Sequence, residues 1–220
     1  MTPPQVIELR EDPDSQARAL SAAARALLRG ELVLLPAEGL YGLHAAVLAQ
    51  GALERLVRLK QTPAGRGFIL LVGTPEQAGR LAARLPGVAA ELIGRAWPGP
   101  LTLLLPATSA VPPALQPEGL VALRCPGSPL LRELALSLPS PLVSSSANSS
   151  GAPPPASLAQ ITPEIREGCR VVIDGGTLSG RGSTVVRPEE DGRVTLLRPG
   201  LWVPGPEFDV RPDAGASRTS

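Results

Sequence analysis

The sequence has very few lysine, histidine and aromatic residues. Its 220 residues include one histidine, two tryptophans, two phenylalanines and one tyrosine. The single histidine, His44, excludes a metal centre built from several histidines. So few aromatic rings also exclude the rows of base-stacking platforms that single-strand nucleic-acid binders use. Lys60 is the only lysine among many arginines, so it is a more informative cation than any one arginine.

Other features are absent as well. The sequence contains no run of about 18 apolar residues, the length needed to span a bilayer. Its N-terminus lacks the pattern of a secretory signal. The net charge of +1 excludes a strong electrostatic grip on nucleic acid or membrane by the domain as a whole. Cys125 and Cys169 are far apart and fit no metal spacing. We therefore expect a cytoplasmic protein with reduced thiols and no membrane partner.

The composition predicts a folded core, with 43% hydrophobic and 19% charged residues. Helical spacing or helix-start signals occur at residues 17–28, 51–60, from 74, 88–95, 128–138 and, more weakly, from 157. Short apolar runs predict strands at 32–35, 68–72, 101–105, 120–124, 141–144, 170–174, 183–187 and 194–198. This alternation indicates an α/β or α+β fold, a twisted sheet of mixed parallel and antiparallel strands with flanking helices. We expect one domain over residues 1–204 and a disordered tail over 205–220.

Polar segments interrupt the apolar pattern where predicted strands end, the usual place for ligands in α/β sheets. They span residues 36–43, 60–67, 97–102, 144–151 and 174–184. The most specific is 144–151 (SSSANSSG), which gathers hydroxyls, an amide and backbone N–H groups in one loop. Arg124 closes an apolar strand, which is costly unless the guanidinium meets an anion or an acidic partner. No phosphate-binding P-loop, dinucleotide fingerprint or nucleophile elbow is present.

Each of these segments also has a structural explanation. Residues 36–43 can be a plain turn, 60–67 a solvated helix end, 144–151 a helix cap or linker, and 174–184 a glycine-rich hairpin loop. We assign 97–102 (WPGPLT) to a rigid corner of the core, with Thr102 as a candidate exception. His44 could serve as a general base or be a surface residue, and we assign it no role.

Seven motifs together carry a family resemblance. They are residues 36–43 (PAEGLYGL), 60–63 (KQTP), 97–102 (WPGPLT), 121–124 (VALR), 146–151 (SANSSG), 183–186 (STVV) and 197–200 (LRPG). Their order and spacing over about residues 15–200 resemble the YrdC-like family, whose characterised members include threonylcarbamoyl-AMP synthases. The resemblance implies a twisted mixed sheet around a concave, positively charged central cavity. The length of the chain is similar to that of the single-domain branch.

The resemblance also implies a reaction and a site. Such proteins join L-threonine, bicarbonate and ATP into threonylcarbamoyl-AMP and pyrophosphate, with Mg²⁺ on the triphosphate and no organic prosthetic group. A downstream complex transfers the threonylcarbamoyl group to tRNA, and any binding of tRNA or double-stranded RNA by this chain would be weak. No side chain would act as a catalytic group and no metal would be held by the protein. Instead, Lys60 and Arg124 would position the substrates and hold their negative charges. Implied contacts are Lys60, Ser146, Asn148 and Arg198 for ATP, Arg124 and Ser183 for threonine, and Tyr41 and Thr184 as further substrate contacts.

Two positions depart from the family pattern. Synthases usually have threonine where this chain has Ala37, and arginine where it has Thr62. Loss of a buried cationic contact to a triphosphate could cost roughly 2–5 kcal/mol, and Arg66 is a candidate to compensate. Two alternatives to synthesis therefore stay open: a divergent paralogue that binds nucleotide or RNA without making the intermediate, and a non-catalytic subunit of a tRNA-modifying complex.

Overall fold

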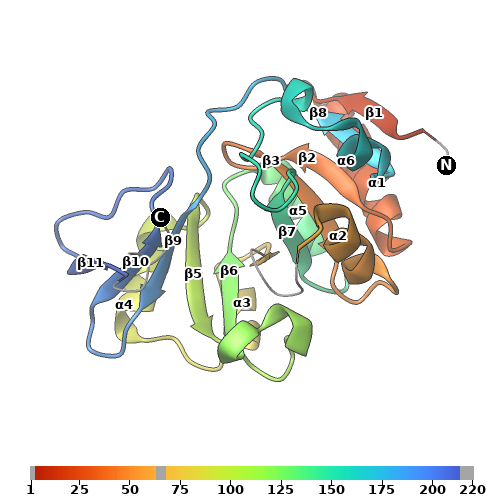
Figure 1. The fold of residues 1–220 in the computed structure, drawn as a ribbon. Coiled ribbons are helices and arrows are strands. Elements are labelled where there is room, and N and C mark those ends of the chain that lie inside the picture. Colours follow the sequence, from red (N-terminus) through yellow and green to blue (C-terminus); the bar gives the residue numbers. More distant parts are fainter. Residues whose placement is uncertain (1–2, 63–67, 214–220) are drawn as a thin grey trace.

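The computed structural model describes residues 3–62 and 68–213. Within them, eleven strands form one sheet (Figure 1). In chain order they are β1 (Gln5–Glu8), β2 (Val33–Pro36), β3 (Tyr41–Ala46), β4 (Ile69–Leu71), β5 (Leu101–Pro106), β6 (Leu120–Arg124), β7 (Leu142–Ser146), β8 (Val171–Asp174), β9 (Thr184–Pro188), β10 (Val194–Arg198) and β11 (Val210–Pro212). Their order across the sheet is β1-β8-β2-β3-β7-β4-β6-β5-β9-β10-β11.

The sheet mixes both strand directions. β1/β8, β8/β2, β4/β6, β5/β9 and β10/β11 pair in parallel, and β2/β3, β3/β7, β7/β4, β6/β5 and β9/β10 pair antiparallel. The predicted fold class, a mixed sheet with flanking helices, is confirmed.

The described helices follow the predicted segments closely. They are α1 (Pro13–Leu28), α2 (Ala52–Lys60), α3 (Pro75–Leu81), α4 (Gly87–Ala96), α5 (Pro129–Ser137) and α6 (Pro163–Glu167), with 3₁₀ turns at Pro113–Leu115, Pro117–Gly119 and Leu158–Gln160. The start of α1 is fixed by Asp12, whose carboxylate accepts from the Ser15 N–H at 2.7 Å. Thr74 precedes α3 as predicted, but its side chain makes no capping hydrogen bond. The weak helical pattern from Ser157 becomes a 3₁₀ turn followed by the short α6.

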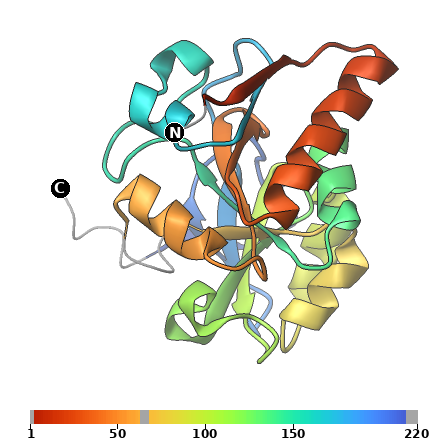
Figure 2. The ribbon, with the colours of Figure 1, turned by 90° about the vertical axis from the view of Figure 1, so that its right-hand side faces the viewer.

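Two apolar clusters hold the helices to the sheet. In one, α1 and α5 lie side by side (Figure 2) and bury leucines and alanines against Val33, Leu35, Leu142 and Ile173. The larger cluster joins α2, α3, α4 and α6 to β5, β6, β9 and β10, and also to residues such as Leu34 of β2 and Val143 of β7 that alternate with those of the first cluster. The strand ends that carry the polar motifs are therefore anchored in a packed interior.

Three strands were not predicted from the sequence. β3 begins within the 36–43 segment, for which a plain turn was one interpretation, and continues to Ala46. It pairs antiparallel with β2 through a short hairpin in which the Ala37 N–H donates to the Leu40 carbonyl at 2.9 Å. Its glycine and alanines do not give the apolar run that marks a strand. β1 and β11 lie at the two edges of the sheet, where four and three residues are too short for a pattern.

The prediction of a disordered tail from Gly205 is wrong for residues 205–213. Phe208 is 7% exposed; its ring centroid lies 6.1 Å from that of Trp202, and the Arg95 guanidinium lies over it at 5.8 Å. β11 then pairs with β10. The buried Phe208 ring anchors this segment, although its Pro/Asp/Gly-rich composition is typical of disorder. Residues 214–220 lie outside the described residues.

Two further expectations concern the cysteines and the membrane. Cys125 and Cys169 are free and buried, and burial raises the pKa of the two thiols to about 11 and about 12. No helix in residues 3–62 and 68–213 is both long and apolar enough to cross a membrane.

We predict that Phe208→Ala lowers the free energy of unfolding by about 3 kcal/mol, because it removes a buried ring. Urea denaturation followed by circular dichroism measures this. Val203→Ala is the matched control, since Val203 is 74% exposed and its truncation should change stability by less than about 0.5 kcal/mol. Equal effects of the two variants would show that residues 205–213 do not pack on the domain.

Candidate functional site

A cavity of about 340 Å³ gathers residues from distant parts of the chain. Seven of the eight predicted site residues line it: Tyr41, Lys60, Arg124, Ser146, Asn148, Ser183 and Arg198. Thr184 is not among the lining residues. Ala37 and Thr62, the two departures from the family pattern, both line the cavity.

The sheet places these side chains through the ends of its strands. Arg124 and Ser146 are the last residues of β6 and β7, and Lys60 is the last residue of α2. Ser183 immediately precedes β9, and Arg198 ends β10. Because these ends meet around one hollow, five distant segments supply one set of polar groups.

The positive charge of Arg124 is buried and is only partly balanced by a nearby negative charge. Arg124 is 4% exposed, and its Nε lies 3.9 Å from Glu38 Oε1, too far for a hydrogen bond, so that Nε has no partner in the described structure. Glu38 Oε1 also accepts from the Gly127 N–H at 2.8 Å. Burial lowers the pKa of Arg124, Glu38 partly opposes this, and Arg198 adds to the lowering. Such a guanidinium is best stabilised by an anion entering the cavity.

Lys60 holds residues 146–150, called the Ser/Asn loop below, in place. Its Nζ donates to the carbonyls of Ser146 at 2.5 Å and Asn148 at 2.8 Å, and its own carbonyl accepts from the Ser150 N–H at 3.0 Å. An ammonium group has three protons, so one donor is left for a ligand. Burial lowers the pKa of Lys60 to about 8. The side-chain amide of Asn148 donates to the Ala152 carbonyl, and within residues 3–62 and 68–213 its buried Oδ1 has no partner.

Arg198 and Ser183 form a second polar pair. Arg198 Nη2 donates to the Ser183 carbonyl at 2.9 Å and to its hydroxyl at 3.2 Å. The chain beyond Arg198 packs so closely that a Cβ on Gly200 would lie 2.4 Å from the Ser183 carbonyl carbon. Only glycine fits there.

None of residues 97–102 lines the cavity. Trp97 is buried and its Nε1 donates to the Leu101 carbonyl at 2.6 Å, which makes this a structural corner. Thr102, the candidate exception, does not line the cavity, but its buried hydroxyl lies 2.9 Å from that of Ser183, which does.

Tyr41 and Thr184 use their hydroxyls within the fold. The Tyr41 hydroxyl lies 2.8 Å from the Gly176 carbonyl and 3.1 Å from the Asp174 carboxylate, and accepts from the Gly175 N–H. Burial, together with Asp174, raises the pKa of Tyr41 to about 12. Tyr41 thus anchors the glycine-rich loop. The Thr184 hydroxyl donates to the Trp202 carbonyl, so the structure does not bring it to the other site residues.

Several residues at the cavity were missed or misjudged from the sequence. Glu38 belonged to a noted motif but received no role; a carboxylate just after an apolar strand was the available signal. Ser144 lines the cavity, and His44 beneath it is fully buried rather than a surface residue. Arg66, the candidate to compensate for Thr62, lies outside the described residues.

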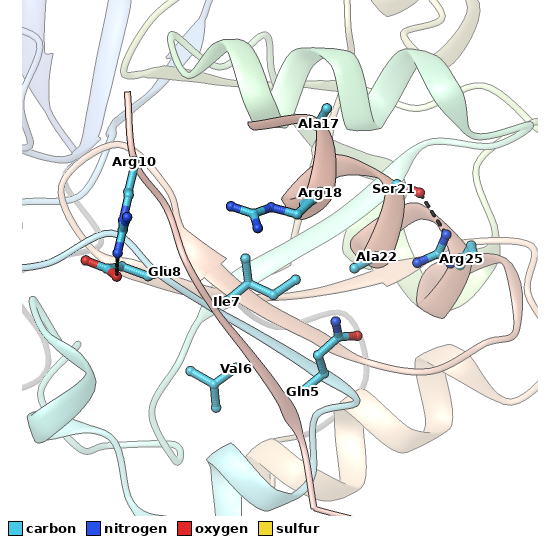
Figure 3. A pocket seen from close by; sticks show the side chains of 10 residues that line it. All are labelled: Gln5, Val6, Ile7, Glu8, Arg10, Ala17, Arg18, Ser21, Ala22 and Arg25. Carbon is cyan, nitrogen blue, oxygen red and sulfur yellow. Dashed lines mark hydrogen bonds and ion pairs between the residues drawn. The ribbon is translucent and has the colours of Figure 1, made fainter. Parts of the chain in front are cut away.

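A larger groove of about 700 Å³ lies between β1 and α1 (Figure 3). None of the predicted site residues lines it. Its three arginines are exposed; Arg10 pairs with Glu8 at 2.7 Å and Arg25 donates to the Ser21 hydroxyl at 2.9 Å. The smaller cavity, with its buried and under-compensated cations, is therefore the candidate site. No cluster of three or more potential metal-binding side chains occurs in the described part of the chain.

Comparison with known proteins shows the family to which the chain belongs. The Sua5/YciO/YrdC family model, described as "Telomere recombination", matches residues 25–200. The chain belongs to this family. A threonylcarbamoyl-AMP synthase of Chromohalobacter salexigens is 36% identical over 169 residues, which cover 76% of this chain and 90% of the relative.

Longer relatives share only part of their length with this chain. A threonylcarbamoyl-AMP synthase of Pyrococcus abyssi is 38% identical over 181 residues, covering 81% of this chain but 53% of the relative, so the chain spans about half of it. The structure of P. abyssi Sua5 complexed with L-threonine superposes with a TM-score of 0.77 at 32% identity, over 90% of this chain and 58% of that one. Escherichia coli YciO superposes with a TM-score of 0.77 at 24% identity, over 91% and 97% of the two chains, and supports the fold.

The lowered pKa of Lys60 predicts pH-dependent binding of ATP, the expected ligand. As pH rises through about 8 the ammonium loses its proton, so ATP affinity should fall about tenfold between pH 7 and 9. Isothermal titration calorimetry at fixed ionic strength measures this. Lys60→Arg is the control: its guanidinium stays protonated, so its affinity should stay flat. A wild-type affinity that is equally flat would contradict the assignment.

Proposed function

We propose that this protein synthesises threonylcarbamoyl-AMP from L-threonine, bicarbonate and ATP, releasing pyrophosphate. The observation that carries the proposal is the convergence of Arg124, Lys60 and Arg198 on one cavity, with hydroxyl groups beside them. These cations suit a carboxylate and a triphosphate bound next to each other. The synthase relatives, one of them covered over most of its length, support it.

Arg124 is the residue that best suits the amino-acid carboxylate. Its guanidinium is buried, Glu38 lies 3.9 Å away, and its Nε has no hydrogen-bond partner among the described residues; a bidentate carboxylate would satisfy two of its donors at once. Lys60, with one proton to spare, and Arg198 suit the phosphate oxygens. The Ser146–Asn148 loop lies beside Lys60 and suits the nucleoside.

The chemistry needs positioning more than a reactive side chain. Bicarbonate and the threonine amine condense with loss of water to a carbamate. A carbamate oxygen then forms a bond to the α-phosphorus as the bond to pyrophosphate breaks. Charge develops on phosphate oxygens, which fixed cations stabilise. Mg²⁺ would arrive on the triphosphate and be held mainly by it. The mixed anhydride is labile to water, so a partner that transfers it to tRNA would have to take it up rapidly.

A second candidate function is nucleotide binding without synthesis. It is favoured by the two departures from the family pattern, since Ala37 and Thr62 both line the cavity. A methyl group and a neutral hydroxyl there supply less hydrogen bonding and less charge than the family's threonine and arginine.

We predict that pyrophosphate release requires threonine and depends on Arg124. Arg124→Gln should lower kcat/KM for threonine at least 30-fold, as loss of a buried charge pair costs about 2–5 kcal/mol, while the affinity for ATP changes less. Arg84→Gln is the control, because Arg84 is exposed and pairs with Glu190 at the surface. A rate indifferent to threonine in the wild type would refute the proposal.

Restoring the family residues separates the two candidate functions. If the chain is a synthase, Ala37→Thr and Thr62→Arg should change pyrophosphate release by less than about tenfold from a measurable wild-type rate. If the wild type binds ATP without turnover and activity appears only in the double variant, the protein is the nucleotide-binding paralogue.

A further inference from the structure

The only histidine of the chain lies directly behind the wall of the cavity. His44 on β3 faces Ser144 on β7 in the antiparallel register, and its Nε2 lies 3.2 Å from the Ser144 hydroxyl. Ser144 lines the cavity, as does Gly42 two residues before His44. A Cβ on Gly42 would lie 2.8 Å from His44 Cε1. The imidazole therefore fills the space under Gly42 and reaches the ligand space only through Ser144.

This position is an unfavourable one for an imidazole. His44 is 0% exposed, and its Nδ1 has no hydrogen-bond partner in the described structure. Ala46, the next residue of β3 on the same face, belongs to an apolar cluster. An apolar side chain would avoid burying an unsatisfied ring nitrogen. The contact with Ser144 is the one side-chain hydrogen bond of this imidazole within the described residues, although backbone carbonyls of Gly42 and Val33 also lie near the ring.

The surroundings keep the imidazole neutral. Burial is the main cause and the positive charge of Arg124 the second; they outweigh the opposing effect of the nearby backbone carbonyls of Gly42 and Val33 and lower the pKa of His44 to about 3. His44 is therefore no general base near neutral pH. A neutral imidazole carries one N–H and one lone pair, so its bond to Ser144 fixes either the donor or the acceptor role of that hydroxyl.

The surroundings of His44 favour one of the two neutral tautomers of its ring. An unpaired buried acceptor is tolerated better than an unpaired buried N–H, which places the proton on Nε2 and leaves the lone pair on Nδ1. Nε2–H then donates to Ser144, and the hydroxyl proton of Ser144 is free to point into the cavity. A donor there matches the cations Lys60 and Arg124, which call for an anionic ligand.

We propose that His44 is a positioning residue: as the Nε2–H tautomer it donates to Ser144 and aims the Ser144 hydroxyl at an anionic group of the bound substrate. That group is either the carboxylate of the amino acid or a phosphate of the nucleotide. The inference rests on the proposed function for the identity of these ligands, but not for the tautomer or the orientation of Ser144.

The tautomer is measured first, by two-dimensional ¹H–¹⁵N NMR of the imidazole in uniformly ¹⁵N-labelled wild-type protein. We expect one neutral ring with the proton on Nε2 and shifts that do not change between pH 5 and 9. A proton on Nδ1, or a ring that titrates near pH 6.5, would overturn the proposal. This readout requires no substrate.

Ligand binding is measured next, by calorimetry with L-threonine alone and with Mg·ATP alone. Ser144→Ala should weaken one of the two ligands about fivefold, the effect of one hydrogen bond. His44→Leu should weaken the same ligand by the same factor, and the double variant should show no further loss. His44→Gln, which can still donate an N–H to Ser144, should retain most of the affinity.

Other outcomes decide against the proposal. If His44→Leu weakens binding but Ser144→Ala does not, or if their effects add, His44 acts through packing and the proposal fails. Urea denaturation of each variant checks folding, and Ser137→Ala at the end of α5 is the control for loss of a serine hydroxyl away from the cavity. If threonine does not bind while the ATP effects follow the expected pattern, the proposed function fails and the role of His44 stands. If the wild type binds neither ligand, both fail.

Discussion

One constraint shapes the whole site: a guanidinium is buried at the end of a central strand, and no anion among the described residues is close enough to hydrogen-bond to its Nε. Arg124 is held 3.9 Å from Glu38, whose carboxylate also accepts from a backbone N–H. Burying a charge is costly unless it is paired and hydrogen-bonded. A fold that keeps this arrangement, with Lys60 and Arg198 at the same cavity, has a site whose electrostatics favour a bound anion.

The sheet is what makes this site possible. The order of strands puts β6, β4, β7 and β3 side by side in the middle of the sheet, and their ends bring Arg124, Ser146 and the 36–43 hairpin to one place. Short-range bonds then fix the loops: Lys60 holds the Ser/Asn loop, and Tyr41 holds the glycine-rich loop before Ser183. Since the backbone is set by these bonds, the positively charged groups are preorganised before any ligand enters.

Much of the fold and most of the site could be predicted from the sequence, for a physical reason. Buried strands such as β5 and β6 appear as apolar runs, and a polar residue that ends such a run, like Arg124, stands out. β3 could not be found this way because its small residues carry no apolar run, and Phe208 anchors a segment whose composition suggests disorder. Ser183 and Thr184 were both predicted at the site, but neighbours on an extended chain point to opposite sides, so only Ser183 reaches it. His44 stood out as the sole histidine but could be assigned no role from the sequence, because its contact with Ser144 depends on register across the sheet.

The most direct test is a crystal structure of the protein with L-threonine and a non-hydrolysable ATP analogue. We expect the threonine carboxylate within hydrogen-bond distance of the Arg124 guanidinium, and phosphate oxygens of the analogue at Lys60 and Arg198. Ligands bound elsewhere, with Arg124 still facing only Glu38, would contradict the proposed role of this cavity.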